Sequence, residues 1–326
     1  KNLEDFIIET PLENPLGLLN KQFDSSLIED IQDKWIPYNF KNQNIDDFLE
    51  NLNIDKTVEI SSIRGGYSNA LKQLNKFIEV GYEDYAEYRS DPSKEASSQL
   101  SPYFHSGQIS THEVFDKISK LESWSPESIN PKMVGRREGW WGGSNNFESF
   151  MDELITWREL GYHTCVRRAN YNQYSSLPEW AIKTLDEHSS DEREYIYSLD
   201  ELTYSQTHDE IWNAAQNQLR TQGVIQNYLR MLWGKKILEW TPNPQIALSY
   251  MITLNDRYSL DGRDPNSYSG VFWILGRYDR AWGPERSIFG KIRYMTSDST
   301  ARKFNLKPYL EKWGNESLGV STSILK

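Results

Sequence analysis

The chain has 326 residues, of which 37% are hydrophobic and 13% aromatic, with 12 Trp and 19 Tyr. This length fits one large domain or two small ones, and the aromatic content excludes disorder as the main state. No apolar run approaches the ~18 residues of a membrane span. The single cysteine, Cys165, excludes an internal disulfide and any cysteine-rich zinc or iron–sulfur site.

The net charge of −11 is distributed unevenly along the chain. Residues 1–60 carry 5 basic and 13 acidic side chains, residues 61–215 carry 15 and 25, and residues 216–326 carry 16 and 9. The last third is therefore net positive and is able to present a basic face to a phosphate-bearing partner. A solvated charge pattern without a partner explains the same distribution, so charge alone leaves both interpretations open.

The first predicted feature in chain order is an acidic segment, residues 1–64, which we interpret as a linker-like arm packed on a larger body. Helical spacing of apolar side chains begins in residues 71–78. Pro102 then lies near the first turn of a further predicted helix. Residues 140–146, with two glycines after two tryptophans, read as a loop.

The second half of the chain continues this helical pattern. Apolar side chains recur at helical spacing over residues 147–157, and two more helices are predicted over 211–222 and 225–240, separated around Gly223. No stretch alternates like a strand between hairpin turns. We therefore predict an all-α domain with long ordered loops over residues 65–326.

The common catalytic and ligand motifs give little support to hydrolase or metal chemistry. The histidines do not have HExxH or other metal-ligand spacing, and the sequence contains no GxSxG motif and no glycine-rich phosphate loop. Cys165 is either a nucleophile or, as is commoner for a single cysteine on an apolar helix, a core residue. We predict no bound metal.

The tryptophans offer a different kind of chemistry. Trp233 and Trp240 are seven residues apart in one predicted helix, so they share a face about 10 Å apart along the axis. Trp212 belongs to the preceding predicted helix. Buried indoles at such separations can relay electrons to a redox cofactor, although aromatic residues at helical spacing are more often core.

Glu153 and Trp157 stand four residues apart on one helix face. A carboxylic acid beside a flat indole is able to hydrogen-bond and stack a nucleobase. A surface glutamate above a core tryptophan is the commoner arrangement, so this pair alone does not decide between the two.

Several longer segments resemble one protein family. Residues 100–110, LSPYFHSGQIS, resemble the flavin-binding signature of photolyases and cryptochromes. Five further segments resemble the class II branch of that family: WNAAQ at 212–216, RMLWGKKILEW at 230–240, LNDRY at 254–258, DGRDPN at 261–266 and FGKIRYM at 289–295. The resemblance keeps its order over residues 65–304, and a weaker match in 1–64 resembles the interdomain linker.

This resemblance implies a helical FAD-binding domain that splits cyclobutane pyrimidine dimers in UV-damaged DNA, using light and fully reduced FAD. The family normally begins with an α/β antenna domain, which we expect to be absent here. A cryptochrome-like photoreceptor and a (6-4) photolyase are the alternatives that the same resemblance allows. We expect a cytoplasmic monomer that is neither secreted nor membrane-bound, nucleoid-associated if the source is bacterial.

The resemblance also implies roles for particular residues around the flavin. Leu100 and Ser101 would hold the FAD phosphates, Asn255 would face flavin N5, and Arg230 and Asp261 would form an ion pair beside the ring system. The photoreduction chain would consist of Trp233, which is nearest the flavin, Trp240 and Trp212.

On the DNA side, the resemblance implies that Glu153 donates a hydrogen bond to a carbonyl of the dimer. Because this requires a protonated carboxyl group, we expect apolar surroundings for it. Trp157 and Trp273 would form the walls of the lesion pocket. The residues expected to contact the DNA or to fill the gap left by the flipped bases are Arg89, Trp282 and Arg293.

Overall fold

The computed structural model describes residues 29, 31, 33–35, 44–136, 138–316 and 318. The chain forms two units, residues 1–59 and 60–326. The first unit contains helix α3 (Ile45–Glu50). Most of the predicted arm lies outside the described residues, and its packing stays a prediction. None of the described helices is both long and apolar enough to cross a membrane.

The described part of residues 60–326 is helical, and it contains no β-strand beyond one isolated bridge between Arg286 and Gly290. This confirms the predicted all-α class. The helices in chain order are α4 (Tyr67–Lys76), η2 (Phe77–Gly81), α5 (Tyr85–Tyr88), α6 (Ser101–His105), α7 (Thr111–Leu121), η3 (Pro126–Ser128), η4 (Pro131–Met133), α8 (Asn145–Met151), η5 (Asp152–Trp157), α9 (Arg158–Arg167), η6 (Tyr174–Ser176), α10 (Glu179–Glu187), α11 (Leu199–Thr203), α12 (Glu210–Gln222), α13 (Asn227–Glu239), α14 (Pro244–Tyr258), α15 (Pro265–Ile274), α16 (Ser297–Lys303) and α17 (Lys307–Trp313).

Local capping explains the boundaries of the two helices that carry the predicted tryptophan chain. The side chain of Asp209 caps α12 by accepting a hydrogen bond from the backbone N–H of Trp212 at 3.0 Å. Gly223 ends α12 with φ of 78°, in the left-handed region where glycine is favoured. Gln226 caps the start of α13. The predicted break around Gly223 is therefore confirmed.

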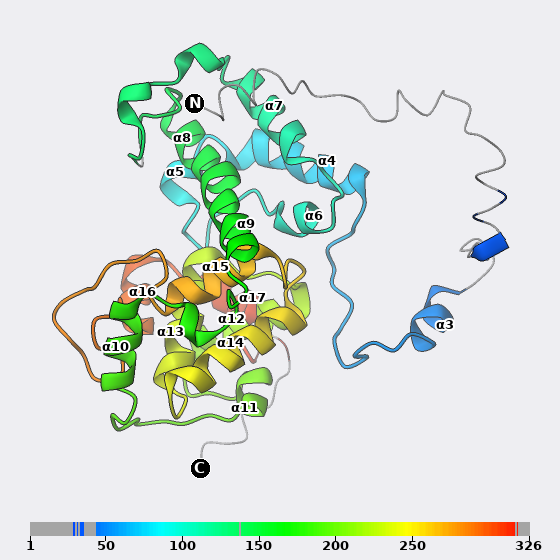
Figure 1. Cartoon of the computed structure of the whole chain (residues 1–326). Helices are drawn as coiled ribbons and strands as arrows, with labels where there is room; N and C mark the ends of the chain where they lie inside the picture. Colours follow the sequence, from blue (N-terminus) through cyan, green and yellow to red (C-terminus); the bar gives the residue numbers. More distant parts are fainter. Residues whose placement is uncertain are drawn as a thin grey trace. The chain divides into compact units, whose positions relative to one another are not determined.

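Helices α12, α13, α14 and α15 form the centre of the core (Figure 1). Helix α13 packs against α12, α14 and α15, which explains why it has buried side chains on most of its surface. Gly234 permits the close approach of α15, because a Cβ atom there would lie 2.1 Å from Cδ1 of Ile274. This packing places the tryptophans of α12 and α13 in the interior.

A second helical run crosses from α8 through η5 into α9, and α9 packs against α15 (Figure 1). The middle of the run, η5, is a π-helix that carries Glu153 and Trp157. π-Helical turns inside α-helices are rare and frequently occur at functional sites. The contact between α9 and α15 brings this segment close to the helix that carries Trp273.

Candidate functional site

Four of the residues predicted to bind the cofactor come together from separate segments. The Arg230 guanidinium lies 3.7 Å from Asp261 Oδ1, and its Nη1 donates a hydrogen bond to Asn255 Oδ1 at 3.1 Å. The hydroxyl of Ser101, at the start of α6, is near Asp261 and helps to lower the pKa of its carboxyl group. The predicted ion pair is present, and we call these four residues the Arg230 cluster.

The electrostatics of the Arg230 cluster favour a charged carboxylate at Asp261. Burial by itself would raise the pKa of this carboxyl group, but the Arg230 charge and the hydroxyls of Ser259 and Ser101 outweigh burial and lower it. Asn255 is only 3% exposed, and its amide donates to the Ser267 hydroxyl. The amide orientation of Asn255 is therefore fixed from two sides.

Leu100 differs from its neighbour Ser101 in its surroundings. Its side chain is fully buried in the core, whereas Ser101 is exposed. A leucine side chain has no polar atom, so only the backbone of Leu100 is able to contact a phosphate group.

Two cavities of the described chain have volumes of about 400 and 220 Å³. Neither is lined by residues of the Arg230 cluster.

The three predicted electron-transfer tryptophans lie together in the core, each at most 2% exposed. The indole N–H of Trp212 donates to the backbone carbonyl of Trp233 at 2.9 Å, and the ring centroids of Trp212 and Trp240 are 5.7 Å apart. Gln216 accepts a hydrogen bond from the Trp233 indole at 2.8 Å. Trp233 therefore contacts Trp212, and Trp212 in turn contacts Trp240.

Sequence reasoning missed the continuation of this aromatic series beyond Trp240. The ring of His208 lies 5.2 Å from that of Trp240, and Tyr195 stacks on His208 at 4.0 Å. The hydroxyl of Tyr197 is 2.7 Å from His208 Nδ1. The two tyrosines precede α11 and His208 follows it, all in irregular segments where aromatic residues have no periodicity that would have revealed the stack.

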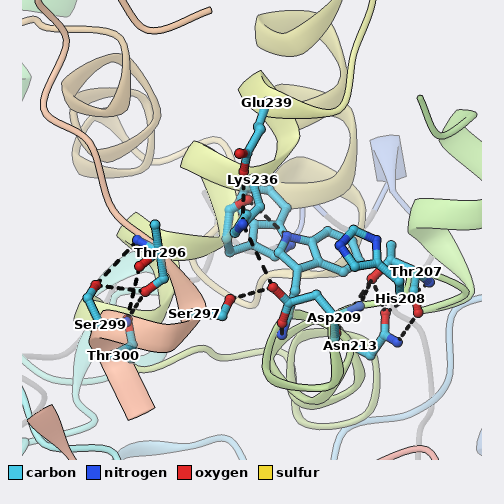
Figure 2. A network of polar contacts seen from close by, with 12 residues as sticks. Thr207, His208, Asp209, Asn213, Lys236, Glu239, Thr296, Ser297, Ser299 and Thr300 are labelled. Carbon is cyan, nitrogen blue, oxygen red and sulfur yellow. Dashed lines mark hydrogen bonds and ion pairs between the residues drawn. The ribbon is translucent and has the colours of Figure 1, made fainter. Parts of the chain in front are cut away.

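A polar network fixes the same end of the tryptophan series (Figure 2). Lys236 forms ion pairs with Glu239 at 2.8 Å and with Asp209 at 4.0 Å. The hydroxyl of Ser297 donates to Asp209, so one carboxylate links the start of α12 to α13 and α16. Lys236 also lies 5.3 Å from the ring centroid of Trp240. The network holds Trp240 in a charged rather than a purely apolar setting.

The two tryptophans predicted to form a lesion pocket are in contact. The ring centroids of Trp157 and Trp273 are 4.4 Å apart, with an angle of 47° between the planes. Tyr278 lies 6.0 Å from Trp157 and 6.1 Å from Trp273 and completes an aromatic trio. The Trp157 indole N–H donates to Asp152 at 2.8 Å. Because these rings come from two different helices, their meeting depends on the packing of α9 against α15.

The surroundings of Glu153 differ from the expected apolar setting. Its carboxylate accepts a hydrogen bond from the guanidinium of Arg89, with which it forms an ion pair. Helix α5, which Arg89 directly follows, packs on α8 and delivers this charge. A guanidinium is only able to donate, so in this structure Glu153 accepts a hydrogen bond rather than donating one. Arg89, one of the predicted DNA contacts, is therefore the ion-pair partner of Glu153 in this structure.

The other two predicted DNA contacts form a separate exposed group. The guanidinium of Arg293 lies 5.2 Å from the ring centroid of Trp282, and that of Arg280 lies 4.3 Å from it. Asp279 accepts a hydrogen bond from the Trp282 indole at 3.0 Å. The indole therefore has two cations near its ring, and both are exposed to solvent.

Comparison with known proteins identifies the family. Over 267 residues, 82% of this chain and 55% of the relative, the sequence is 41% identical to a deoxyribodipyrimidine photo-lyase of Methanothermobacter thermautotrophicus. The chain belongs to the photolyase and cryptochrome family. No family model matches it.

Two solved structures of photolyase and cryptochrome proteins share the fold. A cryptochrome of Synechocystis superposes with a TM-score of 0.57 at 15% identity, covering 80% of this chain and 48% of that one. An archaeal photolyase of Sulfolobus tokodaii, solved with two FAD molecules, gives a TM-score of 0.52 at 18% identity, covering 88% and 54%. The chain spans about half the length of the curated relatives reported for it.

Proposed function

We propose that this chain binds FAD and carries out light-driven repair of cyclobutane pyrimidine dimers in DNA. The observation that carries the proposal is the pairing of two assemblies in one helical body, namely the Arg230 cluster and the Trp157–Trp273 pair. Membership of the photolyase and cryptochrome family supports it, because the curated relatives are named deoxyribodipyrimidine photo-lyases.

The chemistry of the Arg230 cluster fits FAD. Arg230 and Asp261 are each 17% exposed, so a ligand is able to reach them, and Ser101 is exposed. A guanidinium, an amide and a hydroxyl suit a ligand rich in phosphate and carbonyl oxygens. When bound, FAD supplies light absorption and a transferable electron. The residues that would hold it are Ser101, Arg230, Asn255 and Asp261.

The Trp157–Trp273 pair is suited to hold a base that has been flipped out of the duplex. Aromatic faces stack on bases without sequence preference, and each such stack contributes about 1–3 kcal/mol. Glu153 lies on the same helical run as Trp157, where its carboxyl group would meet a pyrimidine carbonyl. Its pairing with Arg89 implies that lesion binding rearranges the pair, since a carboxylate accepts but does not donate hydrogen bonds.

Dimer-splitting by the reduced protein tests the function directly. The protein, carrying chemically reduced FAD, is illuminated with an oligonucleotide that contains one thymine dimer, and restored thymines are measured. We expect dimer loss in the light and none in the dark. A flavin-loaded protein that binds the lesion but restores no thymine would instead indicate a cryptochrome-like photoreceptor, whereas repair of only (6-4) photoproducts would indicate that lesion class.

Replacing Glu153 and Arg293 separately should distinguish the splitting step from DNA binding. Glu153→Ala should slow splitting of the bound dimer about tenfold, because it removes a hydrogen-bonding group at a carbonyl that becomes negatively charged. Arg293→Ala should weaken DNA binding and reduce its salt dependence by about one unit of slope, while leaving splitting unchanged. Single-turnover flash repair and binding titrations across salt measure both. Unchanged splitting in Glu153→Ala would contradict the proposed lesion pocket.

Trp233→Phe should abolish light-driven reduction of oxidised FAD but spare repair by protein that is already chemically reduced. Reduction requires an electron donor next to the flavin and the series through Trp212 and Trp240, whereas repair requires only reduced FAD and a dimer. Absorbance changes under blue light with an external reductant measure the first step. The control is Trp124→Phe, a tryptophan packed against Phe115 away from this series. Equal reduction in wild type and Trp233→Phe would show a different aromatic route.

A further inference from the structure

A cavity of about 220 Å³ lies between the end of α9 and the segment that follows α15. Two of its lining residues, Arg168 and Arg277, are arginines, and none is acidic. The remaining lining residues are Thr164, Ser176, Pro178 and Tyr278. The cavity is therefore positively charged and bears hydroxyl groups.

Arg277 is the buried cation of this cavity. Its side chain is packed on Phe272, and the residue is only 5% exposed. Its Nη2 donates to the backbone carbonyl of Tyr171 at 2.8 Å and to the Ser176 hydroxyl. Among the described residues no carboxylate pairs with Arg277, and its buried Nε has no hydrogen-bond partner. A buried guanidinium without a counter-charge is unfavourable, and burial lowers the pKa of Arg277 to about 10.

Arg168 also lines the cavity, but unlike Arg277 it is exposed to solvent. It is exposed at the C-terminal end of α9, and its Nη1 donates to the backbone carbonyl of Ser176 at 3.2 Å. Both arginines therefore contact Ser176, although like charges repel each other. The hydroxyls of Thr164 and Tyr278 are 2.6 Å apart in the same lining. An anion between the two guanidinium groups would convert this repulsion into attraction.

The cavity adjoins the aromatic pair that we propose to hold the lesion. Tyr278 lines the cavity and also packs against both Trp157 and Trp273. Thr164 follows Trp157 by seven residues on the same helical run, which corresponds to about 10 Å along the axis. A charge held in the cavity thus lies close to any base stacked on the tryptophans.

We propose that this cavity binds a backbone phosphate of the DNA strand next to the flipped lesion, through Arg277 and Arg168. The inference rests on the proposed function and extends it to a contact site. Two guanidinium groups match the paired oxygens of a phosphate. The phosphate supplies the counter-charge that Arg277 lacks within the described chain.

Binding of a dimer-containing oligonucleotide across salt concentrations tests the site. Arg168→Met and Arg277→Met should each weaken binding about tenfold and reduce the salt slope by about one unit. Arg302→Met, at an exposed arginine of α16, is the matched control and should leave both nearly unchanged. Arg168→Met decides the test even if Arg277→Met does not fold, because Arg168 is a surface residue.

Neutral methylphosphonate linkages identify the phosphate itself. Each linkage near the dimer is replaced singly, and we expect one position at which wild type loses about tenfold in affinity but Arg168→Met loses almost nothing further. If the affinity losses caused by the neutral linkage and by Arg168→Met simply add at every position, the proposal is overturned. Equal affinities of wild type and Arg168→Met would also overturn it, provided that wild type binds the lesion. A wild type that binds no lesion DNA would instead refute the proposed function.

Inorganic phosphate provides a readout that does not depend on DNA. At equal ionic strength, phosphate should raise the unfolding temperature of wild type more than chloride does, and this difference should disappear in Arg168→Met. Stabilisation by phosphate combined with normal DNA binding in the variants would identify a free-phosphate site and contradict the DNA assignment.

Discussion

Asp261→Ala is expected to yield protein that is purified with little or no flavin. In the Arg230 cluster, Asp261 provides the only carboxylate, and it holds Arg230 and Ser101 in place. Removal of one partner from a largely buried ion pair leaves the other charge uncompensated. We expect a loss of about 2 kcal/mol in flavin binding, or roughly a thirtyfold increase in Kd.

The ratio of flavin to protein absorbance, followed by reconstitution titrations with FAD, measures this effect. Asp191→Ala is a suitable control, because Asp191 is likewise a carboxylate with side-chain and backbone partners: it lies 2.7 Å from His188 Nδ1 and accepts from the backbone N–H of Ile288. It should retain flavin. A folded Asp261→Ala protein with full flavin content would show that the Arg230 cluster is not the cofactor site.

Lys235→Met is expected to raise the free energy of unfolding at pH 6 and to remove part of its pH dependence. Lys235 is fully buried, and its ammonium group donates to the Ile274 carbonyl at the end of α15. Burial lowers the pKa of Lys235 to about 7, with Asp279 opposing and Arg293 reinforcing the shift. The charged form of this lysine therefore opposes folding.

The sign of the pH effect follows from the two pKa values. Between about pH 7 and the ordinary lysine pKa of 10.5, the unfolded chain holds a proton that the folded chain has released. Wild type should therefore gain stability as pH rises, by about 2–3 kcal/mol between pH 7 and 9. Below about pH 6 the lysine is protonated in both states, so its destabilising effect is complete and no longer changes with pH. Methionine removes this dependence, although it leaves the Ile274 carbonyl without a partner.

Urea unfolding of both proteins at several pH values between 6 and 9 measures the difference. The adjacent lysine offers a matched control, because Lys236 is paired with Glu239 and Asp209. Lys236→Met should destabilise the protein, since it leaves two carboxylates without their cation. An identical pH slope in wild type and Lys235→Met would show that the lysine stays charged in the folded protein.

Local signals in the sequence determined the helices that carry the proposed site. The break between α12 and α13 was predictable because Gly223 adopts a left-handed backbone conformation, which few other residues tolerate. The helical spacing of residues 147–157 likewise predicted α8 and its continuation, but periodicity did not distinguish the π-helix η5 from an α-helix. These features depend on residues within a few positions of one another.

The residues of the Arg230 cluster were predicted to lie in one site because whole segments of the sequence resemble a known family. Their periodicity did not indicate this. Ser101 and Arg230 are far apart in the chain, so nothing in their spacing indicates that both approach Asp261. Trp157 and Trp273 were predicted on the same basis to be the walls of one pocket, and the structure places their rings in contact. Their roles toward flavin and DNA stay predictions that the experiments above test.

Only the tertiary structure decided the charge environments. Arg89 meets Glu153 because α5 packs on α8, and this pairing replaces the apolar setting that we expected. Lys235 and Arg277 look like ordinary surface cations in the sequence, yet packing buries both of them. The burial and partners of a side chain depend on segments distant along the chain, whereas helix boundaries depend on near neighbours, and for that reason sequence patterns gave the helices but not the pKa values or the cavity.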